Sequence, residues 1–166
     1  VEKGIGDFLD LDLPGTKLVV GDGPACEELK RRYPQAIFAG YRHGEDLAAH
    51  ISAADVFVFP SRTDTFGLVL LEAMACGVPV AAYPVIGPID VVIDGVTGSL
   101  SANLREAALA ALQLDPADCR THALAHSWEA STRQFLSALA PVPALTATVA
   151  GQGADLEAAP TPVTRT

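Results

Sequence analysis

The 166-residue chain has few cysteines, few aromatic residues and no long apolar run. Its three cysteines, Cys26, Cys76 and Cys119, are far apart and form no CxxC pair, so neither a disulfide framework nor a zinc site is indicated. We therefore expect a protein of the reducing cytoplasm. Apolar runs such as 56–60 and 68–71 fall far below the ~20 residues of a membrane-spanning helix, and no signal-peptide pattern opens the chain.

Positive charge is also scarce. Eleven Lys and Arg residues stand against 20 Asp and Glu residues, which gives a formal net charge of -9. Such a chain repels the phosphates of nucleic acids and anionic membrane surfaces, so we expect no nucleic-acid partner. A chain of this length buries enough surface for one domain with its own core.

Short runs typical of β-strands alternate with helical patterns along the first hundred residues. We predict strands at 17–20, 36–39, 56–59, 78–83 and 98–100. We predict helices at 25–33, 45–53 and 68–76. The strand runs are almost continuously apolar, as in a parallel sheet that is covered by helices on both faces. The sequence therefore predicts an α/β fold with a doubly wound, Rossmann-like parallel sheet.

The remainder of the chain predicts helices and then a tail. Further helices are expected at 104–114, 116–125 and 128–139, and we expect Trp128 to anchor the last of them by packing. Residues 140–166 are mostly Ala, Pro, Thr and Gly without a period, so they bury too little surface to offset the entropy of ordering. We expect one domain at 1–139 and a disordered low-complexity tail at 140–166.

The loops that leave the strands are the places to look for a ligand site, because ligands of open α/β sheets lie beyond the carboxyl ends of the strands. Gly21 and Gly23 follow the first strand and precede a helix, where backbone N–H groups favour a phosphate. The loop nearly completes G-x-G-x-x-G, but Cys26 stands where a third Gly or Ala belongs and no acid ends the next strand. A dinucleotide site and a tight turn without a ligand remain as alternatives.

The loop at 60–66 is the stronger candidate, because it joins a buried strand to a helix that begins near Gly67. Free N–H groups at such a helix start attract anions. Asp64 or Thr65 as an ordinary N-cap residue is the alternative. Glu72 lies inside the same apolar helix, so we expect it to be buried and to need a partner. A salt bridge with an Arg or Lys elsewhere is the alternative for Glu72.

The interval between Asp64 and Glu72 bears on their chemistry. Eight residues of helix rise about 12 Å, which exceeds the roughly 5 to 9.5 Å between the carboxyl groups that flank one glycosidic bond. The interval suits two acids that hold separate parts of one elongated ligand.

Several motifs together carry a resemblance to a known family. They are, in order, "VEKGI", "LVVGDGP", "IFAGY", "AADVFVFPSRTDTFGLVLLEAMACGVPVAA" and "DGVTGSL". Over about residues 1–139 the chain resembles the donor-binding, C-terminal half of retaining GT-B glycosyltransferases of the E-x7-E type (glycosyl transferases group 1). The "SRTDTFG" wording is most similar to bacterial enzymes related to sulfoquinovosyl and glucuronosyl diacylglycerol synthases.

The resemblance implies catalytic and binding roles for individual residues. Lys3 matches the cation that holds the donor diphosphate, and Gly21 and Gly23 match the glycine-rich loop near the donor. Glu72 matches the second acid of E-x7-E, which binds the ribose hydroxyls. Asp64 matches the first acid, which reaches hydroxyls of the sugar. The family usually has Glu there, and the shorter Asp side chain leaves the identity of the donor sugar undetermined.

Further donor contacts are implied along the same strand ends. Phe66, Gly67 and Leu68 would offer backbone N–H groups to the sugar and phosphate. Tyr41, Arg42 and His43 follow the strand near which the family binds the nucleobase, although a bare surface loop is an equal alternative there.

The implied activity is transfer of a sugar from a nucleoside diphosphate sugar to an acceptor with retention of anomeric configuration, without a cofactor or metal. The subgroup suggests a lipid acceptor at the cytoplasmic face of the inner membrane. We expect an N-terminal acceptor domain to belong to a longer parent, and a strand before Val1 to be central in a 3-2-1-4-5-6 sheet. The isolated chain is then expected to be inactive and marginally folded. A non-catalytic nucleotide-sugar-binding module and a nucleotide-sugar epimerase are the alternatives.

Overall fold

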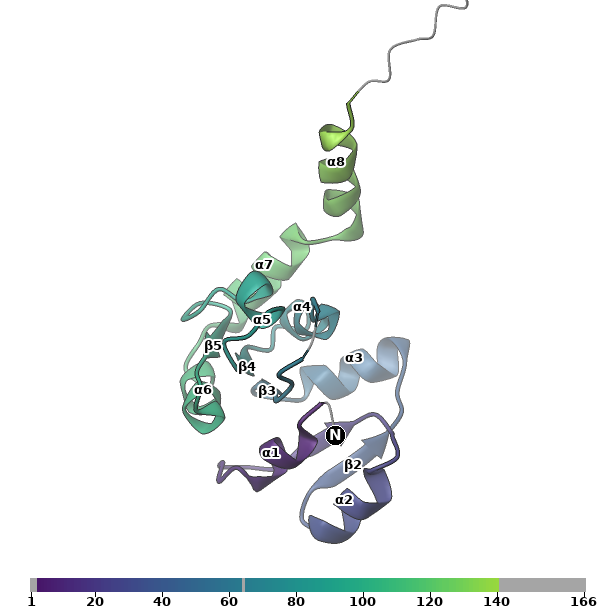
Figure 1. The fold of residues 1–166 in the computed structure, drawn as a ribbon, viewed down its shortest axis with the longest axis vertical. Helices are drawn as coiled ribbons and strands as arrows, with labels where there is room; N and C mark the ends of the chain where they lie inside the picture. Colours follow the sequence, from purple (N-terminus) through teal and green to yellow (C-terminus); the bar gives the residue numbers. More distant parts are fainter. Residues whose placement is uncertain (1–2, 64, 141–166) are drawn as a thin grey trace, which may run out of the picture.

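The computed structural model describes residues 3–63 and 65–140. Strands and helices alternate through most of this part of the chain (Figure 1). The strands are β1 (Leu18–Val20), β2 (Ile37–Gly40), β3 (Phe57–Phe59), β4 (Val80–Ala82) and β5 (Gly98–Leu100). The helices are α1 (Ile5–Asp10), α2 (Cys26–Arg32), α3 (Gly44–Ser52), α4 (Leu68–Ala75), α5 (Pro88–Val91), α6 (Leu104–Ala111), α7 (Pro116–Ala125) and α8 (Trp128–Ala138).

Each predicted strand and helix is present, with ends that differ by a few residues. Two short helices, α1 and α5, were not predicted. All strand pairs are parallel, and the strands are joined by helices, as the doubly wound prediction required. The fold is therefore a Rossmann-like parallel α/β fold.

The strands form two sheets. β1 pairs with β2, and β3, β4 and β5 form a second sheet in that order. β1 and β3 are therefore edge strands within the described part of the chain.

Helices cover both faces of the three-stranded sheet. On one face, Phe59, Val80 and Ala82 pack with buried residues of α4 and α7. On the other face, Ala81 packs with the alanines of α6. Side chains of successive strand residues point to opposite faces, so β4, with all three residues buried, lies at the centre of the core.

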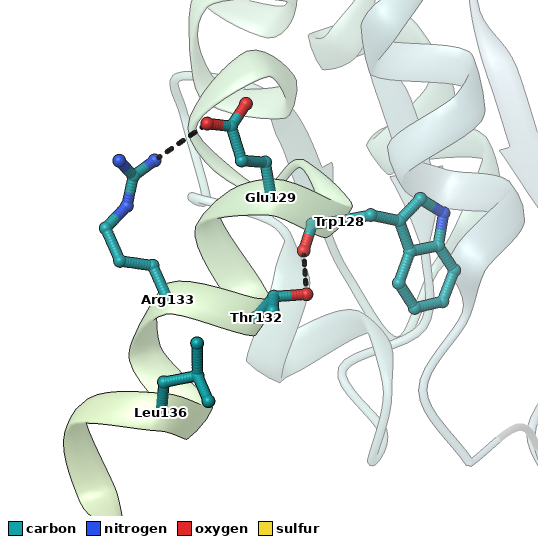
Figure 2. Close-up of a pocket in the computed structure, with 5 residues that line it drawn as sticks. All are labelled: Trp128, Glu129, Thr132, Arg133 and Leu136. Carbon is teal, nitrogen blue, oxygen red and sulfur yellow. Dashed lines mark hydrogen bonds and ion pairs between the residues drawn. The ribbon is translucent and has the colours of Figure 1, made fainter.

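Helix α8 has no buried residue, a property that it shares with α2. In Figure 1 it projects from the α/β layers beyond α7. Trp128 is 79% exposed, so the expectation that it anchors the helix by packing is wrong. Figure 2 shows α8 held by local contacts, with Arg133 paired to Glu129 and the Thr132 hydroxyl donating to the Trp128 carbonyl.

Residues 141–166, nearly all of the predicted tail, lie outside the described residues. No helix in the described ranges is long and apolar enough to cross a membrane.

Candidate functional site

The predicted site residues lie where the strands end. Gly21 and Gly23 follow β1, and Tyr41 and Arg42 follow β2. The loop after β3 leads to Gly67 at the start of α4. Asp64 lies outside the described residues, so its predicted role stays a prediction.

Helix α4 begins without a side-chain cap. Its N-cap residue is Gly67, in the left-handed region at φ 78° and ψ 50°, so the alternative in which Asp64 or Thr65 occupies the N-cap position is wrong. A Cβ on Gly67 would meet the Leu70 side chain at 2.8 Å. The first turn holds no acid, and the first N–H groups of a helix have no partner within it. The start of α4 is therefore able to receive an anion.

Glu72 is exposed, which corrects the expectation that it is buried. The apolar stripe of α4 consists of Leu70, Ala73 and Met74, which are all 0% exposed. Leu68 is 52% exposed and lies one turn before Glu72, on the same side of the helix. In the described ranges no salt bridge of Glu72 is found, so the salt-bridge alternative gains no support. The carboxylate faces solvent on the side of α4 that carries Leu68.

The glycine loop after β1 is shaped by its backbone and not by packing. Gly21 has φ 124°, and its N–H donates to the Gly40 carbonyl at 2.8 Å, which ties the ends of β1 and β2 together. A Cβ on Gly21 or Gly23 would meet nothing within 4 Å. The space above the loop is open, and α2 begins beyond it without a side-chain cap.

Tyr41 and Arg42 lie beside this loop, at the end of β2. Tyr41 is 69% exposed, and its ring stands edge-on against His43 with centroids 4.4 Å apart. The Arg42 guanidinium pairs with Asp46 at 3.4 Å, while its buried Nε has no hydrogen-bond partner in the described chain.

Lys3 lies near the end of β3 because the next residue, Gly4, packs against Pro60. Gly4, at φ 63°, packs so closely that a Cβ there would collide with the Pro60 carbonyl. Lys3 is exposed. The first described residue and the loop that leads to α4 are thus neighbours, although they are about 60 positions apart.

Arg62 is a residue in this region that the sequence prediction missed. Its guanidinium lies over the ring of Tyr83, 3.6 Å from the centroid, and Tyr83 follows β4. Arg62 therefore places a cation on the loop that leads to α4 and connects that loop to the next strand end. The signal was an arginine in the loop that follows β3, but its partner depends on the strand order.

His122 and His126, four residues apart in "HALAH", have the spacing of two metal ligands on one face of a helix. The Nε2–H of His122 donates to the Val91 carbonyl, and the Nδ1–H of His126 donates to the His122 carbonyl, each at 2.9 Å. No cluster of three or more metal-binding side chains occurs within residues 3–63 and 65–140.

Comparison with known proteins gives the family. The family model described as "Glycosyl transferases group 1" matches residues 14–114, more than half of the chain. A D-inositol 3-phosphate glycosyltransferase of Mycobacterium avium is 35% identical over 150 residues, which cover 75% of this chain and 35% of the relative. A GDP-mannose-dependent alpha-mannosyltransferase of Corynebacterium glutamicum is 42% identical over 83 residues, 50% of this chain and 20% of the relative.

Solved structures agree on the fold. Sucrose-phosphate synthase from Thermosynechococcus elongatus superposes with a TM-score of 0.67 at 34% identity, over 83% of this chain and 43% of that one. The galactosyltransferase WaaB superposes with a TM-score of 0.68 at 17% identity, over 82% of this chain and 44% of that one. The chain thus spans only about a fifth to a third of the curated relatives and less than half of these structures. It belongs to the glycosyl transferases group 1 family and has the Rossmann-like fold found in GT-B glycosyltransferases.

Proposed function

We propose that this chain is the donor-binding domain of a retaining glycosyltransferase and binds a nucleoside diphosphate sugar at its strand ends. The observation that carries the proposal is the start of α4. A left-handed glycine begins this helix without a side-chain cap, and Glu72 and Leu68 are exposed on one side of it. That combination offers N–H donors for an anion and a carboxylate for hydroxyl groups.

The diphosphate is assigned to the start of α4 and to Lys3. The N-terminus of a helix carries partial positive charge, and a lysine ammonium adds a full charge. Gly4 fixes the chain beside Pro60, which supports this role for Lys3. During transfer the leaving diphosphate gains negative charge, so donors held in place before the reaction stabilise the transition state more than the ground state.

The sugar and ribose are assigned to the two acids. Glu72 accepts hydrogen bonds from ribose hydroxyls, and Asp64 accepts them from the transferred sugar. Backbone N–H groups of Phe66, Gly67 and Leu68 complete this part of the site. Neither acid acts as a nucleophile in the proposal, because their work is to orient the donor, and correct orientation supplies several kcal/mol of the barrier reduction.

The nucleobase is assigned to the ends of β1 and β2. The open space above Gly21 and Gly23 leaves room for the nucleotide, and Tyr41 offers an exposed ring for stacking. The partly exposed guanidinium of Arg42 supplies a positive charge at the same edge. Relatives named for GDP-mannose and a structure with bound UDP-glucose at 23% identity make GDP-sugars and UDP-sugars the donors to test.

The experiment is a titration of UDP-glucose and GDP-mannose, by calorimetry, against the chain and its Glu72→Ala variant. We expect Glu72→Ala to weaken donor binding by about 1 to 3 kcal/mol of binding free energy, which is the cost of losing a hydrogen bond to a charged group. Glu129→Ala is the matched control, because Glu129 is an exposed helical glutamate with only a surface ion pair to Arg133. Equal affinities for all three proteins would reject the assignment of Glu72.

Transfer itself requires an acceptor-binding partner domain, and we expect the isolated chain to be inactive. Product analysis separates the proposal from its alternatives. A transferase joined to its partner domain forms product only when an acceptor, for example a diacylglycerol lipid, is present. An epimerase converts the donor without acceptor, and a non-catalytic module binds the donor and leaves it unchanged.

A further inference from the structure

Helix α7 ends in a pair of histidines. His122 lies in its last turn, and His126 directly follows its last residue, Ala125. The two rings are neighbours, with centroids 4.4 Å apart and planes inclined by 48°. His122 is half-buried and His126 is exposed, so small ions have access to the pair. Neither histidine lies on a loop that leaves a strand, so the pair is separate from the residues assigned to the nucleotide sugar.

The hydrogen bonds of the two rings determine which nitrogen of each carries the hydrogen. Nε2 of His122 lies 2.9 Å from the Val91 carbonyl at the end of α5, and Nδ1 of His126 lies 2.9 Å from the His122 carbonyl. A carbonyl oxygen only accepts, so these two nitrogens are the donors. In the neutral rings, Nδ1 of His122 and Nε2 of His126 are therefore the nitrogens that carry a lone pair.

This pattern is the one found in histidines that bind a metal. Such histidines usually donate their second ring N–H to a backbone carbonyl or a carboxylate, which orients the ring and raises its basicity. Two nitrogens that each lie about 2.0 to 2.1 Å from one tetrahedral zinc ion are about 3.3 Å apart. Rings with centroids 4.4 Å apart can bring one nitrogen each to that separation. The pair therefore offers two imidazole ligands to one ion, and both outer N–H groups already have their partners.

The charge around the pair also favours a cation. The C-terminal end of a helix carries partial negative charge, and α7 has ten residues with both histidines at that end. Arg120 of the same helix donates to the Ala75 carbonyl at 2.8 Å, so its guanidinium is held at the end of α4. The whole chain has a formal net charge of -9, which attracts cations.

We propose that His122 and His126 bind one divalent transition-metal ion of the kind that imidazole ligands prefer, such as Zn²⁺, through Nδ1 of His122 and Nε2 of His126. Cys119 of the same helix is not a third ligand, because it is buried and its thiol donates to the Thr97 carbonyl at 3.6 Å. Burial also raises the pKa of this thiol. No third metal-binding side chain joins the pair in the described part of the chain, so water fills the remaining positions.

The bound ion fixes the junction between α7 and α8. His122 is attached to the end of α5 through Val91, and His126 is followed by Ser127, the N-cap residue of α8. One ion on both histidines therefore connects the last turn of α7, and through it α5, to the base of the projecting helix (Figure 1). The inference does not depend on the nucleotide-sugar proposal.

The test is a calorimetric titration of zinc chloride into the 166-residue chain, combined with NMR of the ¹⁵N-labelled imidazole rings. We expect one zinc ion to bind per chain and to shift the ¹⁵N signals of His122 Nδ1 and His126 Nε2, while the other nitrogen of each ring keeps its hydrogen. His126→Ala should weaken zinc binding by at least about tenfold, because one of the two protein ligands is lost. The side chain of His126 is exposed, so this variant leaves the core unchanged.

The matched control is His50→Ala. His50 of α3 also lies four residues after a possible metal ligand, Asp46, and contacts its carboxylate at 3.3 Å. Zinc affinity should be the same in this variant as in the parent chain. Absence of zinc binding at millimolar zinc, equal affinities of the parent chain and His126→Ala, loss of binding in His50→Ala, or coordination through Nε2 of His122 would each overturn the proposal.

Discussion

The three-stranded half of the molecule and the two-stranded half share the β-α pattern but differ in how far their strands are buried. In the first, β4 is buried throughout and helices pack on both faces. In the second, β1 and β2 have no buried residue, and neither has α2. Within residues 3–43, Leu9 and Tyr33 are the buried hydrophobic residues. The difference lies in the neighbouring elements and not in the strand sequence, because β1 ("LVV") consists of apolar residues just as β3 and β4 do.

This comparison shows what a parallel strand needs. Parallel sheets are stable when both faces are covered and both edges are paired. β4 meets both conditions, whereas β1 has one partner strand and a cleft on its other side. We therefore expect the two halves to open with different free energies, the two-stranded half first.

The largest expected effect comes from equal truncations in the two halves. Leu70→Ala removes a side chain that is 0% exposed in α4, and should cost about 2.7 to 5 kcal/mol of unfolding free energy. Leu18→Ala makes the same chemical change in half-buried β1 and should cost about 1 kcal/mol. Urea unfolding followed by circular dichroism measures both. Equal losses of unfolding free energy would contradict the difference between the two halves, because they would mean that both halves belong to one equally packed core.

The next largest effect is expected at the junction of the two halves. Gly4→Ala places a Cβ against the Pro60 carbonyl at a left-handed position, so it should cost more than the roughly 1 to 2 kcal/mol of left-handed strain alone. Gly15→Ala is the matched control, because Gly15 has φ 87° but open space around its Cβ. A greater loss at Gly4 than at Gly15, in the same urea titrations, would support close packing at the end of β3. Equal losses would show that this contact is absent in solution.

A smaller, pH-dependent effect is expected inside the two-stranded half. The Tyr33 O–H donates to the Asp10 carboxylate at 2.5 Å, and this bond raises the pKa of Tyr33 above its ordinary value of 10.0. The neutral phenol is the form that donates. Its contribution to stability is therefore complete below pH 10 and is lost as the pH rises through the raised pKa.

The measurement for this effect is the urea midpoint from pH 8 to pH 11 for the parent chain and Tyr33→Phe. The variant should be less stable at pH 8, and the difference should shrink above pH 10. Tyr41→Phe serves as the control, since the Tyr41 ring is 69% exposed and should leave the midpoint unchanged. A constant difference between the parent chain and Tyr33→Phe at all pH values would rule out the role of this bond.

Much of the fold could be predicted from the sequence, for an identifiable reason. Runs such as 56–59 are apolar at every position, and Gly77 ends the helix before β4, so the alternation of strands and helices has local signals. Helix α1 has six residues and begins at Gly4 without a side-chain cap, and α5 has four residues. Helices this short have no periodicity to detect.

The site was harder to predict because its geometry depends on tertiary contacts. Apolar composition suggested that all of α4 is buried, yet the core uses one stripe and leaves Leu68 and Glu72 outside it. Packing was also wrongly expected for Trp128, which is 79% exposed. The contact between Arg62 and Tyr83 depends on β3 and β4 being neighbours, which composition does not determine.

The smallest expected effect on stability is at Glu72, and it tests the corrected view of α4. Glu72 faces solvent and lies outside the apolar stripe, so Glu72→Ala should change the unfolding free energy by less than about 0.5 kcal/mol, as exposed substitutions do. Leu68→Ala, on the same side of the helix, should also cost far less than Leu70→Ala, because Leu68 is 52% exposed. A loss at Glu72 of several kcal/mol would mean that the carboxylate has a buried partner in solution. A stable variant leaves any change in donor affinity attributable to the lost carboxylate, because the helix that carries it is intact.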